Sequence, residues 1–341
     1  MPDRDVLILR GGEVESALDG REREIIETVA ESYKTHAAGE SSLPTSLFLR
    51  FPASERDRII ALPAYIGGGF DVAGVKWVSS FPGNLGRGLN RASAVIVLNS
   101  SLTGVPEVVM EGSVVSAKRT AASAALAATT LHGGDVRSVG FVGCGPINFE
   151  TARFLLAASP SVEEFVLFDV EAARARQFAE KCRGLNGALK IQSVPEIREV
   201  LRGADVISFA TTAATPHLFD LSACRRGSTV LHISLRDFAP EVILACDNVV
   251  DDVDHVCRER TSVHLAGQLT GSRDFIRCTL AEVLNGTARA KSNPDDVTIF
   301  SPFGLGVLDL AVGQLAVRLA HAQGFGTTVE SFLPGPYGER D

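Results

Sequence analysis

Residues 138–169 decide the fold of this chain, and they read SVGFVGCGPINFETARFLLAASPSVEEFVLFD. The stretch begins with a short apolar run rich in β-branched residues, which is typical of a buried strand. Gly143 and Gly145 follow at once, and residues 147–158 then carry apolar side chains at helical spacing. A second apolar run ends in Asp169. The order is therefore strand, glycine turn, helix, strand and acid.

This order predicts a dinucleotide-binding site. Gly143 lets the chain turn tightly out of the first strand, and Gly145 has no side chain that would block a pyrophosphate at the helix N-terminus. Asp169 would accept hydrogen bonds from the adenosine ribose and would repel a 2'-phosphate, which favours NAD over NADP. Asn148 stands where the usual fingerprint has a third glycine, which weakens the match. The alternative is an ordinary βαβ unit whose glycines only make a turn.

Composition narrows the class of protein. The chain has 341 residues, of which 45% are hydrophobic and 22% charged, with a net charge of −8. This length allows two domains, and the composition is that of a soluble globular protein. The acidic balance argues against nucleic acid as a partner, and no apolar run approaches the length of a membrane span. Because no signal peptide is visible, we expect a cytoplasmic protein.

The cysteines and histidines predict no metal site. The six cysteines lie far apart and form no CxxC pair, so we expect free thiols. Cys144 lies inside the glycine turn, where a small residue tolerated beside a cofactor is a better interpretation than a nucleophile. The seven histidines show no metal-binding spacing. We expect His232, on a predicted strand, to be a satisfied core or cofactor-side histidine.

The rest of the chain shows two patterns of predicted secondary structure. The N-terminal part alternates like strands and ends in an Ala-rich helix over 116–131, whereas the part from residue 135 onward alternates strand and helix. Strands are expected at 138–142, 165–169, 189–194, 205–211, 229–234 and 248–251, and a short strand with a glycine turn at 298–306. Helical patterning is expected at 267–284 and 307–322. Loops after two of these strands would bring Thr211, Ser234 and Asp237 to the carboxyl edge of a parallel sheet.

These patterns predict an α/β protein with two domains. A Rossmann-type NAD-binding domain is expected over residues 121–306. An α+β domain that binds the substrate and forms a dimer is expected over 1–120 and 307–341. Too few helices accompany the N-terminal strands to cover both faces of their sheet, so we expect a homodimer.

Three cationic side chains stand in unusual settings. Lys76 is central in the apolar strand GVKWV, Arg50 ends the run LFLR, and Arg119 opens the Ala-rich helix. Each alone is more often a surface charge than a ligand. Together they predict a pocket for carboxylates, which arginine binds through two parallel hydrogen bonds and lysine attracts as a point charge.

Five blocks between residues 57 and 148 carry a resemblance to a known family, and the likeness covers nearly the whole chain. They are DRIIALPAYIGGG (57–69), GVKW (74–77), NRASAVIVLN (90–99), VMEGSVVSAKRTAASAALAA (109–128) and VGCGPIN (142–148). Their order and spacing resemble the ornithine cyclodeaminase/μ-crystallin family, which also holds NAD-dependent alanine dehydrogenases and ketimine reductases. Within it, the blocks look most like the N-(2-amino-2-carboxyethyl)-L-glutamate dehydrogenases, which make 2,3-diaminopropionate for siderophores and peptide antibiotics.

The resemblance implies roles for individual residues. Substrate carboxylates would be bound by Arg50, Lys76, Arg91 and Arg119. NAD contacts would fall on Ser93, Arg119, Thr120, Gly143, Gly145, Pro146, Ile147, Asp169, Thr211, Ser234 and Phe303. The cyclodeaminases carry their catalytic aspartate in a GGDCPGKTE-like stretch, whereas this chain has SLRDFAPE at 234–241. Asp237 is the nearest candidate, and the departure counts against ornithine cyclisation.

The reaction implied is an oxidative C–N cleavage. Hydride would leave the glutamate α-carbon for the nicotinamide, and the resulting imine would take up water and give 2-oxoglutarate and 2,3-diaminopropionate. Lys76 would hold a carboxylate and polarise the imine, and Asp237 could act as a general base. The alternatives are an ornithine cyclodeaminase, an alanine dehydrogenase or ketimine reductase, and a non-catalytic NAD(H)-binding protein. The retained Lys76 and Arg119 speak against the last.

Overall fold

The computed structural model describes residues 4–335, which form two compact units. The first unit contains the chain up to Arg119 and again from Leu305 onward, and the second unit is Thr120–Gly304. Residues 1–3 and 336–341, which the sequence places in the first domain, lie outside the described residues. The predicted fold class, an α/β protein with one parallel sheet, is confirmed.

The first unit is built on a mixed sheet. Its strands pair in the order β16-β1-β7-β6-β5-β4-β2, and β3 also pairs with β4. Among these pairs, β1 and β7 are parallel and the others are antiparallel. The strands are β1 (Val6–Leu9), β2 (Ser41–Ser42), β3 (Leu47–Phe51), β4 (Ser54–Ile66), β5 (Val72–Ser80), β6 (Ala92–Ser100), β7 (Pro106–Glu111) and β16 (Thr327–Val329).

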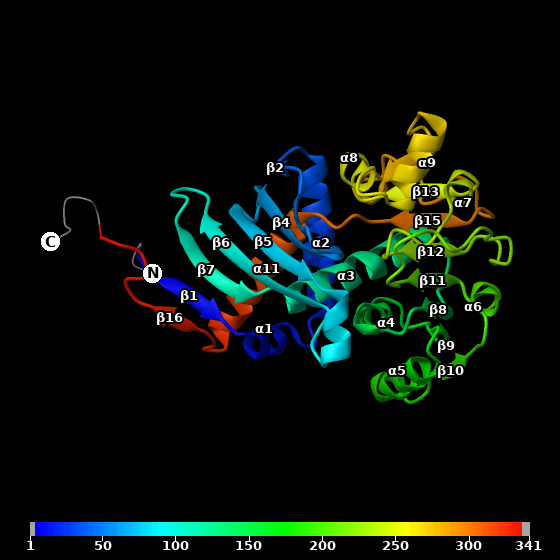
Figure 1. Ribbon diagram of the computed structural model, residues 1–341, viewed down its shortest axis with the longest axis horizontal. Helices are drawn as coiled ribbons and strands as arrows, with labels where there is room; N and C mark the ends of the chain where they lie inside the picture. Colours follow the sequence, from blue (N-terminus) through cyan, green and yellow to red (C-terminus); the bar gives the residue numbers. More distant parts are fainter. Residues whose placement is uncertain (1–3, 336–341) are drawn as a thin grey trace. The chain divides into compact units, whose positions relative to one another are not determined.

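Helices cover one face of this sheet. Helix α11 (Gly306–Ala322) packs across β4, β5 and β6, and it also contacts α1 (Gly11–Leu18) and α2 (Glu22–Ala37). Figure 1 shows α11 behind the strands of the sheet. Burial alternates along strand β4 as a result. Leu62 is buried beneath the helices, and Ala61 lies on the opposite face of the sheet. The helix burial is nearly complete because α11 is apolar around most of its circumference.

The second unit is a doubly wound parallel sheet. Its strands follow the order β10-β9-β8-β11-β12-β15-β13-β14, which Figure 1 shows from β10 to β13. They are β8 (Ser138–Val142), β9 (Glu164–Phe168), β10 (Lys190–Ser193), β11 (Val206–Phe209), β12 (Thr229–His232), β13 (Asp247–Val250), β14 (Ile276–Thr279) and β15 (Thr298–Ser301). The order reverses between β8 and β11, the point at which such sheets bind ligands.

The helices of the second unit connect its strands. They are the C-terminal part of α3 (Ser113–Leu131), then α4 (Pro146–Ala158), α5 (Ala172–Leu185), α6 (Ile197–Gly203), α7 (Pro240–Leu244), α8 (Val253–Val256), α9 (Ser262–Thr270) and α10 (Leu280–Leu284). Every residue of β8 is buried, as expected for a strand covered on both faces.

One sequence-based expectation is wrong. Residues 267–284 are not helical throughout, because strand β14 lies between α9 and α10. It pairs with β13, and its Arg277 makes an ion pair with Asp247 through Nε and Oδ1 at 2.5 Å. Strand β14 has the sequence IRCT, which lacks the run of apolar residues by which strands of equal length, such as β11 (VISF), were predicted.

Candidate functional site

The glycine turn has the geometry that the sequence predicts. Gly143 has φ = 88°, and a Cβ there would lie 2.7 Å from the carbonyl oxygen of Ala210, so only glycine fits. Gly145 is the N-cap residue of α4, and a Cβ built on it would meet no protein atom within 4 Å. Pro146 and Ile147 form the first turn of α4. The N-terminus of this helix is therefore open to an anionic group.

Asn148 braces the turn. The side chain is buried, and its Nδ2 donates to the carbonyl oxygens of Val142 at 3.1 Å and Gly143 at 2.7 Å. Its Oδ1 accepts a hydrogen bond from Ser208 Oγ at 2.7 Å. The residue that weakens the glycine fingerprint thus ties the turn to the neighbouring strand β11.

Asp169 follows β9 and faces the same turn. Its Oδ2 accepts a hydrogen bond from the Cys144 backbone N–H at 2.8 Å, and its Oδ1 accepts one from the Glu171 N–H at 2.9 Å. Burial, together with the negative charge of Asp169, raises the pKa of the Cys144 thiol to about 12. Cys144 is therefore a neutral thiol at physiological pH, in keeping with its interpretation as a small residue and not a nucleophile.

The loops after β11 and β12 converge on Asp237. Thr211 Oγ1 and Ser234 Oγ both donate hydrogen bonds to its carboxylate. Leu235 has φ = 68°, an unusual conformation for a residue with a side chain, in the turn between Ser234 and Asp237. The structure thus brings together three residues that the sequence assigns to the cofactor side.

Asp237 has a third partner, His217, that the sequence analysis did not consider. His217 Nε2 lies 3.0 Å from Asp237 Oδ1, and the Asp237 side chain is fully buried. Hydrogen bonds from its neighbours hold the pKa of Asp237 below its usual range, although burial opposes them. A buried carboxylate that accepts this many hydrogen bonds is a weak base, so the structure favours an anchoring role for Asp237.

A buried aspartate also fixes the turn that contains Phe303. Asp251 accepts hydrogen bonds from the backbone N–H groups of Phe303 at 2.9 Å and Gly304 at 2.7 Å. Phe303 follows β15, the strand next to β12, so it belongs to the same carboxyl edge as Ser234. The backbone of the turn that carries Phe303 is therefore fixed at this carboxyl edge.

The first unit contains a buried cluster of three charged residues. Lys76 Nζ lies 2.6 Å from Asp309 Oδ2, and Arg119 Nε lies 2.9 Å from Asp309 Oδ1. Ser116 Oγ lies 3.2 Å from the same Lys76 nitrogen. Two cations thus share one carboxylate, which leaves the cluster with a net positive charge. No other carboxylate within the described chain pairs with Lys76 or Arg119.

Burial changes the proton affinity of Lys76. The side chain is 2% exposed, and burial together with the charge of Arg119 lowers the pKa of Lys76 to about 8, although Asp309 opposes the shift. The lysine is therefore able to gain or lose a proton near physiological pH.

Gly74 allows α11 to approach the sheet at this cluster. A Cβ on Gly74 would lie 2.2 Å from the Val97 carbonyl oxygen and 3.1 Å from the Leu310 side chain. Leu310 adjoins Asp309 in α11, so the missing side chain at Gly74 helps to bring Asp309 to Lys76.

The other predicted cations lie elsewhere in the first unit. Arg50 is exposed on β3, its guanidinium carbon is 5.5 Å from the centre of the Phe48 ring, and its cross-strand partner is Arg58. Arg91 precedes β6, and its pKa is lowered by burial and by the positive charge of Arg58. Alternation along β4 places Arg58 on the same sheet face as Leu62, the cross-strand partner of Lys76.

Two of the predicted NAD contacts, Ser93 and Thr120, lie outside the loops around Asp237. Ser93 pairs with Ser79, and their hydroxyl oxygens are 2.8 Å apart. Strand alternation places both on the sheet face opposite Lys76, so the structure does not bring Ser93 to the charged cluster. Thr120 directly follows Arg119 in α3 and is the first residue of the second unit.

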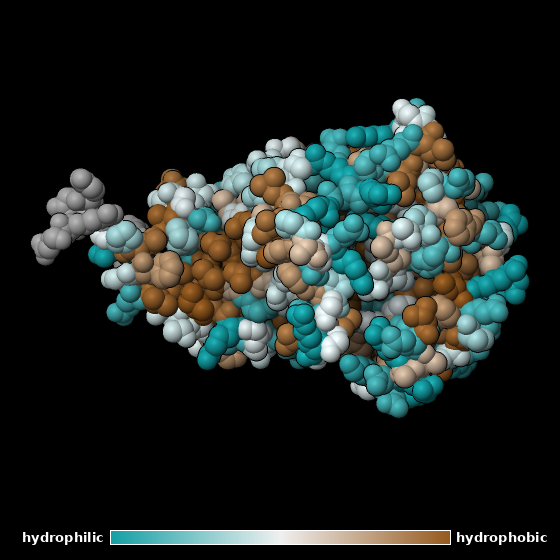
Figure 2. Space-filling view, viewed as in Figure 1, coloured by the Kyte–Doolittle hydropathy of each residue, from teal (hydrophilic) through white to brown (hydrophobic). Residues whose placement is uncertain are grey.

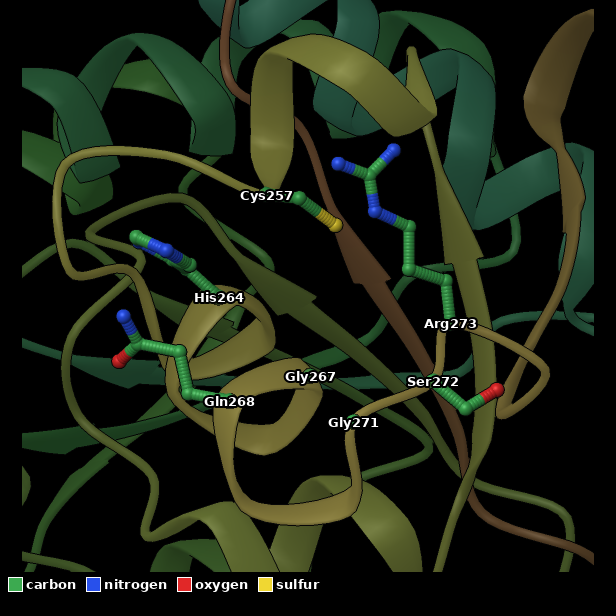
Figure 3. A pocket seen from close by; sticks show the side chains of 7 residues that line it. All are labelled: Cys257, His264, Gly267, Gln268, Gly271, Ser272 and Arg273. Atoms are coloured by element: carbon green, nitrogen blue, oxygen red, sulfur yellow. The ribbon is translucent and has the colours of Figure 1, made fainter.

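A separate pocket lies in the second unit and contains none of the predicted site residues. Its volume is about 460 Å³, and Figure 3 shows the residues that line it, namely Cys257, His264, Gly267, Gln268, Gly271, Ser272 and Arg273. Arg273 is already paired with Asp254 at 2.7 Å, and the pKa of Cys257 is raised by burial. The pocket therefore offers neither an unpaired arginine nor a reactive thiolate.

Comparison with known proteins identifies a matching family and relatives of similar length. Residues 7–320 match the model of the ornithine cyclodeaminase/mu-crystallin family. N-((2S)-2-amino-2-carboxyethyl)-L-glutamate dehydrogenase from Staphylococcus aureus is 25% identical over 97% of this chain and 100% of its own length.

Two solved structures have the same fold. The Delta(1)-pyrroline-2-carboxylate reductase of Thermococcus litoralis, in complex with NADH and L-proline, has a TM-score of 0.88 at 25% identity, covering 95% of this chain and 100% of that one. An archaeal alanine dehydrogenase dimer with bound NAD has a TM-score of 0.86 at 26% identity, covering 96% of this chain and 99% of that one.

Among residues 4–335, none of the helices combines the length and the apolar composition that a membrane span requires.

Proposed function

This chain belongs to the ornithine cyclodeaminase/mu-crystallin family, and from that premise we propose that it is an NAD-dependent dehydrogenase of N-(2-amino-2-carboxyethyl)-L-glutamate. Its relatives include dehydrogenases and reductases of amino acids, and it is an enzyme of that type. The proposal rests above all on the buried cluster of Lys76, Asp309 and Arg119. Its unbalanced positive charge favours a carboxylate ligand.

NAD fits the residues of the second unit. The open N-terminus of α4 at Gly145 would receive the pyrophosphate, and Asp169 would accept hydrogen bonds from the adenosine ribose. Thr211, Ser234 and Phe303 stand on the loops where the nicotinamide half of the cofactor would bind. When bound, NAD would accept a hydride from the substrate α-carbon.

The preference for NAD over NADP is testable at Asp169. Its carboxylate should repel a 2'-phosphate, so the protein should bind NADH more tightly than NADPH. Replacing Asp169 by alanine should narrow the ratio of the two dissociation constants, which titration of cofactor fluorescence measures. Asp220→Ala, at an exposed aspartate of the same unit, should leave the ratio unchanged. Equal affinity of the unmodified protein for both cofactors would refute the assignment.

The cations of the first unit would bind and activate the substrate. Arg119 and Lys76 would hold the carboxylate next to the reacting carbon. With its pKa lowered to about 8, Lys76 would also exchange a proton with the imine nitrogen. Water then adds to the imine carbon, and cleavage of the C–N bond releases 2-oxoglutarate and 2,3-diaminopropionate.

The choice of a substrate with three carboxylates rests on the further arginines. Arg50, Arg58 and Arg91 add positive charge to the first unit, and Arg58 lies on the sheet face of Lys76. Alanine and proline each have one carboxylate, so neither would use this additional positive charge. The Staphylococcus aureus relative named for the proposed substrate supports the same choice.

A panel of amino acids tests this function. The protein is incubated with NAD and, in turn, the glutamate adduct, ornithine, alanine and proline, while absorbance reports NADH and mass spectrometry identifies products. We expect NADH, 2-oxoglutarate and 2,3-diaminopropionate from the adduct alone. Proline formed from ornithine without net NADH would instead identify a cyclodeaminase, and NADH from alanine an alanine dehydrogenase.

We also propose that the chain works as a homodimer. The face of the first sheet opposite Lys76 exposes apolar side chains, among them Leu47, Leu49, Trp77 and Val95. Figure 2 shows apolar residues gathered over β5, β6 and β7. An apolar sheet face of this kind is suited to burial against a second copy of itself. The related archaeal alanine dehydrogenase was solved as a dimer.

A further inference from the structure

Asp237 is enclosed by hydrogen-bond donors. Its Oδ1 accepts from Thr211 Oγ1 and lies 3.0 Å from His217 Nε2, and its Oδ2 accepts from Ser234 Oγ. The side chain has no exposed surface. A substrate or a water molecule therefore cannot reach the carboxylate without displacing one of these neighbours.

His217 is held by the same residue in two ways. Its backbone N–H and that of Leu218 both donate to the Asp237 carbonyl oxygen at 2.9 Å, and its ring contacts the Asp237 carboxylate. The His217 side chain is nevertheless 39% exposed. A carboxylate at Nε2 favours a proton on that nitrogen, which leaves Nδ1 to take or give a proton at the surface.

The neighbouring histidine is not suited to this role. His232 is completely buried, its Nε2 accepts the Asp237 backbone N–H at 3.2 Å, and its Nδ1 lies 3.2 Å from Ser301 Oγ. Burial lowers the pKa of His232, so the ring stays neutral. The charged and titratable groups near His217 include Asp237, the neutral His232, and Arg236, whose charge acts on His232.

We infer that His217, oriented by Asp237, is the proton-transfer residue of the reaction proposed above, on which this inference rests. His217 Nδ1 takes a proton from the water whose oxygen bonds to the imine carbon. The same nitrogen returns that proton to the departing amine when the C–N bond breaks, so the residue ends each cycle unchanged. Thr211 and Ser234 on the same loops place the step next to the cofactor side of the second unit.

The substitution His217→Gln tests the role, because glutamine can donate to Asp237 but cannot exchange protons near neutral pH. We expect kcat with the glutamate adduct to fall by roughly a hundredfold or more, with the affinity for NAD unchanged. The acidic limb of the kcat–pH profile should disappear, and added imidazole should restore part of the rate. His264→Gln, in the separate pocket, should behave like the unmodified enzyme.

A second variant tests the coupling of the two residues. Asp237→Asn removes the carboxylate that orients the ring through Nε2, so kcat should fall while KM for the adduct and the affinity for NAD change little. A His217→Gln enzyme with unmodified kcat and pH profile would overturn the inference and leave the proposed function standing. If the unmodified enzyme forms no NADH with the adduct, the proposed function itself fails and this inference with it.

Discussion

At the scale of single residues, Asp309 is the carboxylate that pairs with both buried cations of the charged cluster. In Asp309→Asn, Lys76 and Arg119 would remain buried without their carboxylate. Breaking such a pair by removing one partner costs about 3–5 kcal/mol, so we expect the free energy of unfolding to fall by about that amount. Urea unfolding followed by circular dichroism measures the change.

The control for this prediction is Glu15→Gln, which removes an exposed acid from the same unit. It should change the free energy of unfolding by less than about 0.5 kcal/mol. If Asp309→Asn were as stable as this control, Asp309 would not stabilise the two buried cations.

The lowered pKa of Lys76 predicts a specific pH dependence. In the proposed function, its protonated ammonium would hold the substrate carboxylate, and its pKa is about 8 instead of 10.5. The value of kcat/KM for the adduct should therefore fall as pH rises through about 8. Lys291→Arg is the matched control, because Lys291 also has a pKa lowered to about 8 and lies in the other unit.

The Lys291→Arg enzyme should keep the decline in kcat/KM at the same pH. A flat profile of the unmodified enzyme up to pH 9.5 would show that Lys76 either stays protonated or does not bind the substrate.

At the scale of elements, the packing of α11 on the sheet depends on Gly74. In Gly74→Ala, the new methyl group would collide with the Val97 carbonyl oxygen of the neighbouring strand. Overpacking of this kind typically costs about 1–3 kcal/mol, and it should also reduce kcat by moving Asp309 away from Lys76. Gly69→Ala, where a Cβ meets nothing within 4 Å, is the control for both readouts. Equal stability of the two variants would refute the close packing.

The elements could largely be predicted because their patterns are local. Strands such as β8 and β9 are short apolar runs with clear ends. The glycine turn is predictable because Gly143 and Gly145 directly follow the first of these runs. Strand β14 was missed because its sequence, IRCT, contains no run of apolar residues. Likewise, the face on which Ser93 lies depends on strand alternation over the whole of β6, which a motif comparison does not consider.

The missed site residues have ordinary sequence surroundings. Asp309 lies in the first turn of an apolar helix, where an acid is expected for its interaction with the helix dipole. His217 lies in a loop, and only the fold brings it to Asp237. The available signals were a single acid in the apolar stretch 306–322 and a histidine soon after Thr211 in a loop at the carboxyl edge.

At the scale of the whole molecule, the exposed sheet face predicts the assembly. Trp77 and Val95 are 45% and 42% exposed on that face. In Val95→Glu, a charge would have to be buried in the interface, so we expect dimers to dissociate into monomers at micromolar concentration. Analytical ultracentrifugation measures the mass. Leu269→Glu, on an exposed leucine of the second unit, should leave the assembly unchanged. A Val95→Glu dimer would exclude this face as the interface.

The most direct test of the proposed activity follows the hydrogen that leaves the substrate. The adduct is prepared with deuterium on the glutamate α-carbon and incubated with the enzyme and NAD, and the reduced cofactor is analysed by mass spectrometry. We predict that the reduced cofactor carries one deuterium and that 2-oxoglutarate and 2,3-diaminopropionate appear in equal amounts. Unlabelled NADH, or cleavage without any reduced cofactor, would contradict the proposed oxidation at that carbon.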